Sequence, residues 1–168
     1  AAREWSRSGR VIVEHVIERT FPRVVGGDVF VVDGRVRFWG LMSCVRDKCE
    51  SDSDGTVSGE TFVPAGEMLP SGLSAEEISS VKAEVQRLVR SLGLLFGEFN
   101  VEILIGVDGR PWFLEFGARA GGNMIPVQLS DVSGIDLVAA NVLCAMGLRP
   151  ERIDFDPIEA VGCFATYV

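Results

Sequence analysis

Two glutamates on either side of a predicted hairpin turn are the residues of this chain best suited to bind a metal ion. Glu102 and Glu115 lie in two apolar runs joined by Asp108-Gly109, a dipeptide favoured in two-residue type I′ turns. If these two residues form the whole loop, Val107 pairs with Arg110, and the same register pairs Glu102 with Glu115. Directly opposed residues have Cβ atoms about 4.5–5.5 Å apart. The two carboxylates are therefore expected to face each other.

Opposed carboxylates repel each other unless a cation lies between them or one of them is protonated. Mg²⁺ commonly binds one or two carboxylates together with water and substrate phosphates, so the pair suits a hard divalent cation. The alternative is a solvated sheet face on which both acids point into water, and the hairpin alone does not decide between the two. The other face of the hairpin is apolar in this register and is predicted to be core: Val101, Ile103, Ile105, Trp112, Leu114 and Phe116.

Arg119 follows the second apolar run on a glycine-rich turn that extends from Phe116 to Asn123. A planar guanidinium beside backbone amides suits the oxygens of a phosphate group. The combination of two opposed acids and this arginine favours a metal and phosphate site over a solvated sheet face.

These residues resemble the ATP-grasp superfamily of carboxylate–amine ligases. The nucleotide-binding C-terminal lobe of that family has a strand with a metal-binding Glu, a hairpin, and then Glu-x-Asn-x-Arg. Asn100-Val101-Glu102 is similar to the first motif and the run from Glu115 to Gly122 to the second, with Gly117 where many members have Asn as a further metal ligand. Some branches, including the L-amino-acid ligases, also lack that Asn and continue with a run similar to Asn123 to Pro126.

The resemblance implies a role for each matching residue. Glu102 and Glu115 would bind Mg²⁺, with Mn²⁺ as an alternative, and Arg119 would act on the phosphate as the catalytic residue. Asn100 would belong to the nucleotide-binding residues. ATP is the implied nucleotide.

Glu14, His15 and Ile17 look like part of the hinge between the two ATP-grasp lobes. There the backbone carbonyl of His15 and the amide of Ile17 would bind the adenine edge, a contact that makes little demand on the side chain. The ribose-binding Glu that many members have after the hinge is missing, and Glu18 or Asp28 could replace it.

The implied activity is ATP-dependent ligation of a small-molecule carboxylate to an amine through an acyl phosphate. Catalysis would depend on positioning and on neutralising charge, without a covalent nucleophile. The other lobe of the family, with its glycine-rich loop and phosphate-binding lysines, is missing from these residues. Lys48 and Lys82 are the only lysines, and they are predicted in a polar loop and on a helix. The fragment is expected to be inactive alone and its full-length parent to be the enzyme.

Two alternatives remain open at this stage. One is a non-catalytic nucleotide-binding or scaffold module, either derived from an ATP-grasp lobe or an unrelated α+β domain, for which Gly117 and the altered region after the hinge are the best support. The other stays within the enzymes, because ATP-grasp carboxylases and purine-pathway ligases also fit the two-Glu motif.

Composition narrows the class of protein. The chain has 168 residues, which fits one domain, and its net charge of −8 argues against nucleic acid as a partner. It contains no apolar run of the roughly 20 residues that a membrane span needs. The four cysteines show no zinc-site spacing, so we expect free thiols and a cytoplasmic location. A homodimer is compatible with the sequence.

The expected fold is α+β, an antiparallel sheet with packed helices, as in the C-terminal lobe of ATP-grasp proteins. We expect a tail at 1–9, the lobe at 10–150, and the truncated start of a following segment at 151–168. The predicted elements are a strand within 10–17, a hairpin over 28–39, a long polar loop over 43–72 near the acceptor substrate, a helix that begins after Ser74 and ends at Gly93, and a helix over 135–146.

Overall fold

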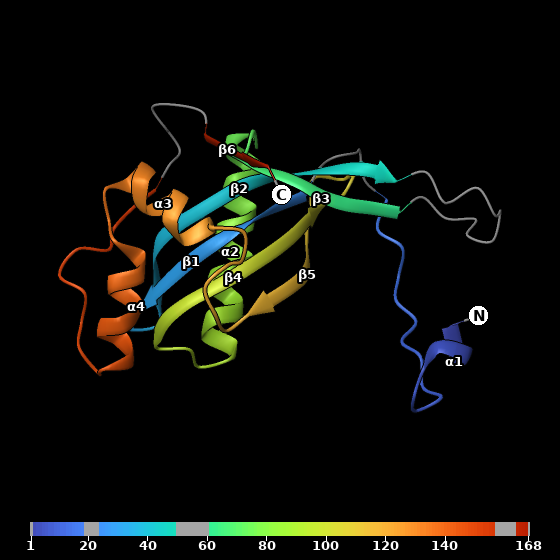
Figure 1. The fold of residues 1–168 in the computed structure, drawn as a ribbon, viewed down its shortest axis with the longest axis horizontal. Coiled ribbons are helices and arrows are strands. Elements are labelled where there is room, and N and C mark those ends of the chain that lie inside the picture. The colour runs from blue at the N-terminus through green and yellow to red at the C-terminus, as the bar shows by residue number, and fades with distance from the viewer. Residues whose placement is uncertain (1, 19–23, 50–60, 157–163, 168) are drawn as a thin grey trace.

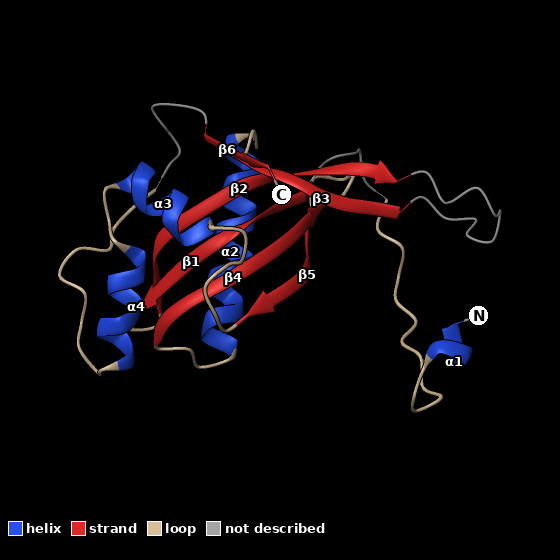
Figure 2. Ribbon diagram, in the orientation of Figure 1, coloured by secondary structure: helices blue, strands red, loops and turns tan. Residues whose placement is uncertain are grey.

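A six-stranded antiparallel sheet forms the centre of the fold (Figures 1 and 2). The computed structural model describes residues 2–18, 24–49, 61–156 and 164–167, and the strand order is β5-β4-β1-β2-β3-β6. The strands are β1 (Val24–Val32), β2 (Arg35–Cys49), β3 (Thr61–Leu69), β4 (Phe96–Ile105), β5 (Pro111–Gly117) and β6 (Phe164–Tyr167). The helices are α1 (Ala2–Trp5), α2 (Ala75–Ser91), α3 (Ile125–Ser133) and α4 (Leu137–Ala145). The predicted α+β class is confirmed.

Helix α2 covers one face of the sheet, as Figure 1 shows. Its start is the predicted capping box: the Ser74 hydroxyl accepts from the amide of Glu77, and the Glu77 carboxylate accepts from the amide of Ser74 at 2.9 Å. Val81, Val85 and Val89 are fully buried. They pack on the sheet residues that form one of the two cores: Val25, Val29, Val31, Val36, Leu41, Phe99, Val101, Ile103 and Ile105.

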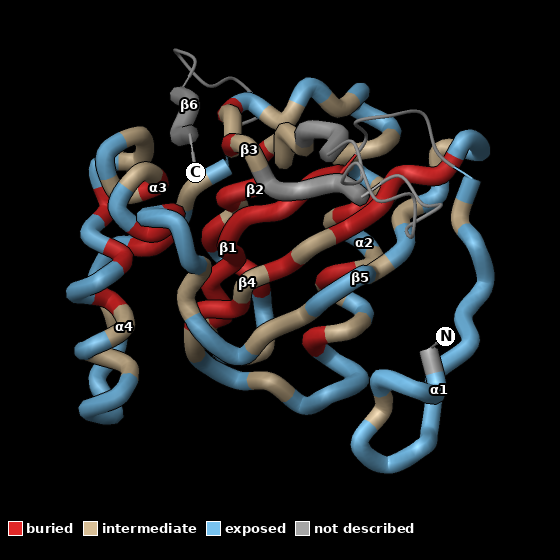
Figure 3. Tube along the Cα trace, turned by 45° about the vertical axis from the view of Figure 1, so that its right-hand side comes forward, coloured by how far each residue is buried: buried red, intermediate tan, exposed pale blue. Residues whose placement is uncertain are grey.

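Helices α3 and α4 lie on the opposite face, over one end of the sheet (Figure 1). They bury a second core that includes Phe30, Phe38 and Met42 from the sheet and Leu129 and Leu137 from the helices. Helix α4 corresponds to the helix predicted over 135–146, whereas α3 was not predicted. Buried residues therefore gather along the central strand β1, which has a core on each side (Figure 3).

The first hairpin has the two-residue turn that its sequence predicts. Val32 pairs with Arg35, and Asp33 and Gly34 both have positive φ, 52° and 73°. These angles are those of a type I′ turn. The amide of Gly34 donates to the carbonyl of Leu95 at 3.2 Å, so the turn is also fixed by a neighbouring segment.

The second hairpin has the same Val-Asp-Gly-Arg sequence but a different turn. The amide of Gly109 donates to the carbonyl of Gly106, and the amide of Gly106 donates to the carbonyl of Arg110, both at 2.9 Å. The loop therefore has three residues, with Gly109 at φ 75°, which is the second common hairpin type. The predicted two-residue turn is wrong.

A β-bulge in β5 nevertheless restores the predicted register around the acids. Ile103 pairs with Phe113, whereas Glu102 pairs with Glu115, so Leu114 is the extra residue. The longer loop shifts the pairing by one position, and the bulge shifts it back. The prediction that Glu102 and Glu115 are opposed is confirmed.

The bulge also changes which residues of β5 face the core. Trp112 is 36% exposed and Leu114 is 52% exposed, so their predicted place in the core is wrong. Phe113 and Phe116 pack against the α2-side core instead. Their rings contact each other edge to face, with centroids 6.2 Å apart.

Two other predicted segments are wrong. Residues 10–17 form no strand, and Ile12 and Val13 are exposed. A strand needs a partner, and none of the described strands pairs with this segment. The predicted polar loop over 43–72 contains much of β2 and β3, which pair as a long hairpin. Lys48 therefore lies on a strand, and residues 50–60 lie outside the described part of the chain.

Parts of the C-terminal segment pack with the lobe. Ile153 is buried, and the ring of Phe155 stacks on Phe38 with centroids 4.9 Å apart. The amide of Trp39 donates to the carbonyl of Phe155 at 2.9 Å, and β6 pairs with β3. Where the lobe ends along the chain stays a prediction. Among the described helices, no single one is long and apolar enough to span a membrane.

Candidate metal and nucleotide site

One cavity of about 210 Å³ brings together four of the residues that the sequence singled out, Asn100, Glu102, Glu115 and Arg119. It lies on the sheet face opposite α2, beside the first residue of α3. Strands β1 to β5 and the turn after β5 all contribute to it. The remaining lining residues are Gly26, Gly27, Cys44, Arg46, Gly66, Glu67, Val101, Gly122, Asn123 and Ile125.

Each of the two opposed carboxylates is paired with an arginine. Arg46 of β2 forms an ion pair with Glu102, and Nη2 of Arg119 donates to Oε1 of Glu115 at 3.0 Å. The inner pair is more buried, with side-chain exposures of 19% for Arg46 and 25% for Glu102, against 54% for each member of the outer pair. The repulsion expected between the two acids is thus offset by two positive charges.

Arg46 is the residue of this site that sequence reasoning missed. It falls in the stretch that was predicted to be a polar loop, where a single arginine follows no recognisable pattern. Its place on β2, two strands away from β4, follows only from the sheet order.

The donor set fits a hard cation that completes its coordination with phosphate and water. Glu102 and Glu115 provide oxygen ligands from directly paired positions, and Mg²⁺ is usually bound by one or two carboxylates. Within the described residues, no cluster of three or more His, Cys, Asp or Glu side chains could hold a metal by itself. The site therefore suits Mg²⁺ carried by a nucleotide better than a metal held by protein ligands alone.

Asp28 fixes the turn that carries Arg119. It is fully buried, and its two carboxylate oxygens accept from the side-chain amide of Asn100 at 2.8 Å and from the backbone amide of Gly121 at 2.9 Å. The backbone amide of Asn100 in turn donates to the carbonyl of Arg119 at 2.9 Å. Strands β1 and β4 thus hold the turn at both ends.

Glu98 lies beside Asp28 in the same buried region and is held largely as a neutral acid. Burial, followed by the charge of Asp28 and a hydrogen bond with it, raises the pKa of Glu98 to about 8. The side chain of Asn141, on α4, donates to Glu98. Burial also raises the pKa of Asp28, although hydrogen bonds from Asn100 and Gly121 oppose that shift.

These contacts change the interpretation of two predicted residues. The side-chain nitrogen of Asn100 donates to Asp28 and to the carbonyl of Gly27 at 3.1 Å, so its amide group positions the site. Asp28 does not suit the ribose contact, because it is buried and both of its oxygens accept bonds from the protein. Asn100 still lines the cavity, and a role in nucleotide binding stays a prediction.

Comparisons with known proteins show which proteins the chain is similar to. No protein-family model matches the chain. It is 36% identical to carnosine synthase 1 of Gallus gallus over 97 residues, which is 58% of this chain and 10% of that protein. It is 34% identical to carnosine synthase 1 of Homo sapiens over 89 residues, which is 53% of this chain and 11% of that protein.

Solved structures share the fold over most of the chain. Phosphoribosylglycinamide synthetase from Anaerococcus prevotii matches with a TM-score of 0.67 and 24% identity, over 88% of this chain and 34% of that one. L-amino acid ligase from Bacillus licheniformis matches with a TM-score of 0.65 and 21% identity, over 86% of this chain and 33% of that one. The chain therefore shares the fold of these two enzymes over most of its length.

The chain spans about a tenth of the length of the curated relatives it matches. A further ATP-grasp neighbour contains a nucleotide and a metal. The biotin carboxylase domain of 2-oxoglutarate carboxylase from Hydrogenobacter thermophilus, in complex with MgADP, ADP and bicarbonate, matches with a TM-score of 0.56 and 16% identity, over 80% of this chain and 27% of that one.

The predicted ATP-grasp hinge lines a separate and more open cavity. This cavity, of about 560 Å³, lies between residues 14–18 and the β4–β5 turn, with Trp112 on its wall. Glu14 and His15 are exposed and Ile17 is partly buried. The turn begins at Gly106, four residues beyond Glu102 and hence about 13 Å along the strand. The structure does not place the hinge residues in the acid site, and their role in binding the adenine stays a prediction.

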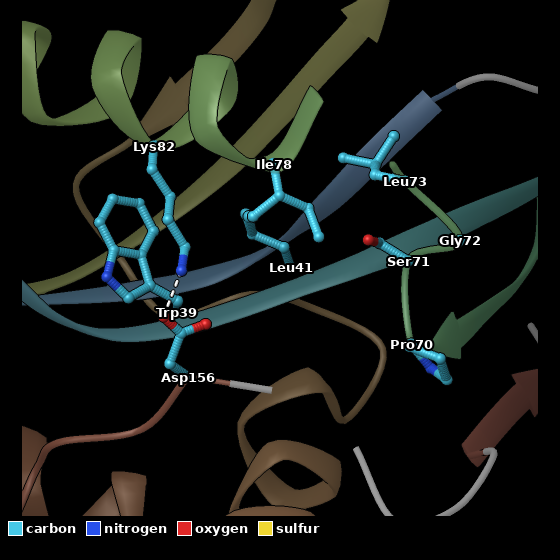
Figure 4. A pocket seen from close by; sticks show the side chains of 9 residues that line it. All are labelled: Trp39, Leu41, Pro70, Ser71, Gly72, Leu73, Ile78, Lys82 and Asp156. Carbon is cyan, nitrogen blue, oxygen red and sulfur yellow. Dashed lines mark hydrogen bonds and ion pairs between the residues drawn. The ribbon is translucent and has the colours of Figure 1, made fainter. Parts of the chain in front are cut away.

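A third cavity, of about 180 Å³, lies on the α2 face, away from the acids (Figure 4). Lys82 of α2 passes over the ring of Trp39, with Nζ 5.4 Å from its centroid, and forms an ion pair with Asp156. Lys82 therefore lies on the face of the sheet opposite Glu102 and Glu115. Its ion pair ties the C-terminal segment to α2.

Proposed function

We propose that this chain is the nucleotide- and Mg²⁺-binding half of an ATP-dependent carboxylate–amine ligase that acts through an acyl phosphate. The observation that carries the proposal is the pairing of two opposed carboxylates with two arginines in one cavity. The names of the similar proteins, which include an L-amino acid ligase and carnosine synthases, support the same class of reaction.

The carboxylates and the arginines have complementary tasks in this proposal. Glu102 and Glu115 would bind Mg²⁺, which supplies charge neutralisation for the phosphate oxygens. Once the carboxylates are neutralised in that way, Arg46 and Arg119 no longer have to compensate their charge. Both guanidinium groups can then bind the oxygens of the transferred phosphoryl group, whose negative charge is spread over three oxygens in the transition state.

The reaction needs no nucleophile from the chain. A substrate carboxylate oxygen attacks the γ-phosphorus of ATP, the bond to the β-phosphate oxygen breaks, and ADP leaves. The nitrogen of a neutral amine then attacks the acyl carbon, and the bond between that carbon and the phosphate oxygen breaks. Inorganic phosphate leaves and takes up the proton that the nitrogen loses. The contribution of the protein is positioning and electrostatic stabilisation.

The fragment alone is expected to be inactive in this proposal. Of the two lysines, Lys82 lies on the α2 face and Lys48 lies on β2, so the described residues provide no glycine-rich phosphate-covering loop with its lysines. The carboxylate and amine substrates, ATP and Mg²⁺ are therefore assigned to the full-length parent.

The test is a screen of the full-length protein with mixtures of amino acids and small carboxylic acids, with release of ADP as the readout. We expect ADP and phosphate only when a carboxylate and an amine are both present. Arg119→Ala is expected to lower turnover at least tenfold with little loss of stability, because the Arg119 side chain is half exposed and its described hydrogen bonds go to Glu115 and to the carbonyl of Ala120.

The control is Arg90→Ala, which removes an exposed arginine from α2 and is expected to leave turnover unchanged. A folded, ATP-binding protein that releases no ADP with any mixture would contradict the ligase proposal. That result would make a non-catalytic nucleotide-binding module the better account.

A further inference from the structure

Glu67 is a half-buried glutamate at the end of the cavity farthest from Glu115, and no part of the proposed mechanism uses it. Its Oε2 atom is inaccessible to solvent and has no hydrogen-bond partner among the described residues. An unpaired buried carboxylate oxygen is costly. A group of this kind at the wall of a binding cavity indicates a positively charged ligand group.

The position of Glu67 follows from the strand register. Glu115 pairs with Glu102, Glu102 pairs with Gly26 across β4 and β1, and Glu67 pairs with Cys44 across β3 and β2. A Cβ on Gly26 would lie 2.6 Å from Sγ of Cys44, which shows how closely the two halves of this row approach.

Across the strands, this row therefore has an acid at each end and Gly26 between them. Glu102 and Glu67 lie on strands separated by three spacings of the sheet, so their backbones are at least about 14 Å apart. Gly26 and Gly27 line the cavity between them, so no side chain of β1 fills this part of the floor. Sγ of Cys44 occupies the space directly over Gly26, and the rest of the cavity, about 210 Å³ in all, suits a phosphoryl group and the acyl group joined to it.

The charges around Glu67 determine which ligand groups can bind beside it. Burial, together with the charge of Asp28, raises the pKa of Glu67 to about 7. Arg46 is paired with Glu102, and the facing Cys44 is a neutral thiol because burial raises its pKa to about 12. A carboxylate or phosphate group would be repelled at this end, whereas an ammonium group would gain a charge-assisted hydrogen bond.

We infer that Glu67 binds the ammonium group of the amine substrate and thereby selects primary amines that are protonated at neutral pH. The inference rests on the proposed ligase function. It gives the two ends of the cavity different tasks: the Glu102 and Glu115 end receives the nucleotide phosphates, and the Glu67 end receives the amine that attacks the acyl group. Before it attacks, the ammonium must lose one proton, and the neighbouring Glu67 carboxylate is the acceptor.

The experiment compares two amines in the full-length protein, before and after Glu67→Gln. The first is an amino acid, whose ammonium group is charged at pH 7. The second is hydroxylamine, which is largely neutral at that pH and captures an acyl phosphate as a hydroxamate. We expect Glu67→Gln to raise the KM for the amino acid at least tenfold, with the KM values for ATP and the carboxylate within twofold. Hydroxamate formation with hydroxylamine is expected to stay within twofold.

One result would contradict the proposed ligase function, and two others would contradict the role of Glu67 in amine binding. No hydroxamate from the wild-type protein with any carboxylate would overturn the proposed function itself. An equal loss of both reactions in Glu67→Gln would overturn the role in amine binding, because Glu67 would then act before the amine enters. Unchanged kinetics with the amino acid would overturn it as well. Glu76→Gln, which changes an exposed glutamate on α2, controls for loss of one charge, and equal melting temperatures confirm folding.

Discussion

Asp28 and Glu98 show how single buried residues set the geometry of the site. Asp28 links β1 to the side chain of Asn100 and to the turn that carries Arg119. Glu98 lies beside Asp28 and accepts a hydrogen bond from the side chain of Asn141 on α4. Two adjacent buried carboxyl groups are stable only if one of them keeps its proton. The proton on Glu98 is thus part of the structure that holds Arg119 in place.

This arrangement predicts a pH dependence of stability. Burial and Asp28 raise the pKa of Glu98 from its usual 4.5 to about 8, so the folded protein keeps a proton that the unfolded chain releases near pH 4.5. The contribution of Glu98 to stability is complete below that pH and is lost as the pH rises toward 8. Each pH unit in this interval lowers the free energy of unfolding by up to about 1.4 kcal/mol.

Glu98→Gln should weaken this dependence, because glutamine is neutral at every pH and can still accept from Asn141. Melting temperatures between pH 5 and pH 9 test it. The variant is expected to show a shallower decline than the wild type, with a residual slope from Glu67, whose pKa is also raised. Parallel curves for the two proteins would contradict the assignment of the proton to Glu98.

At the level of the elements, the turn after β5 depends on close packing around one glycine. A Cβ on Gly121 would lie 2.8 Å from Oδ1 of Asp28, 2.9 Å from Nδ2 of Asn100 and 2.9 Å from Cδ1 of Ile125, whereas a Cβ on Gly122 would meet nothing within 4 Å. The two neighbouring glycines therefore form a matched pair for mutation.

Gly121→Ala is expected to lower the free energy of unfolding by about 1–3 kcal/mol, the usual cost of overpacking a well-packed region. Gly122→Ala should change it by less than about 0.5 kcal/mol. Urea denaturation of the two variants measures both values. Equal stability of the two would mean that Asp28 and Asn100 do not clamp the turn.

The central hairpin shows how far the sequence could predict the elements. The Asp-Gly turn and the alternation of residues placed Glu102 opposite Glu115, and the structure confirms this pairing. The loop length and the bulge at Leu114 were missed, and their two shifts cancel. Neither is encoded in a local pattern, because the same Val-Asp-Gly-Arg sequence forms two different turns. It forms a two-residue turn between β1 and β2, where the amide of Gly34 donates to the carbonyl of Leu95, and a three-residue turn between β4 and β5.

Long-range contacts explain the remaining misses. The end of β2 from Ser43 onward and all of β3 were predicted as loop, although their pairing delivers Arg46 and Glu67 to the cavity. Those side chains reach the site only through the strand order of the sheet. By contrast, the Ser74 capping box and the apolar stripe of α2 are local signals, and they predicted the helix correctly.

The two faces of the sheet differ in what they carry: one is covered by an apolar core, and the other carries the residues of the candidate site. Helix α2 seals one face with an apolar core, and α3 and α4 cover one end of the other. The chemistry-bearing residues gather on the part of that second face where β1 to β5 and the turn after β5 line a single cavity. In the proposed function, these residues bind the nucleotide phosphates, and a second lobe of the full-length parent covers the nucleotide.

The central claim is that Glu102 and Glu115 form a metal-dependent nucleotide site, and titration of the full-length protein with ATP in the presence and absence of Mg²⁺ tests it most directly. With Mg²⁺, Glu115→Gln is expected to weaken nucleotide binding at least tenfold. Without Mg²⁺, the same variant should bind ATP as tightly as the wild type or more tightly, because a negative charge beside Arg119 has been removed. Glu76→Gln should change neither value. Equal Mg²⁺-dependent affinities for the wild type and Glu115→Gln would contradict the account.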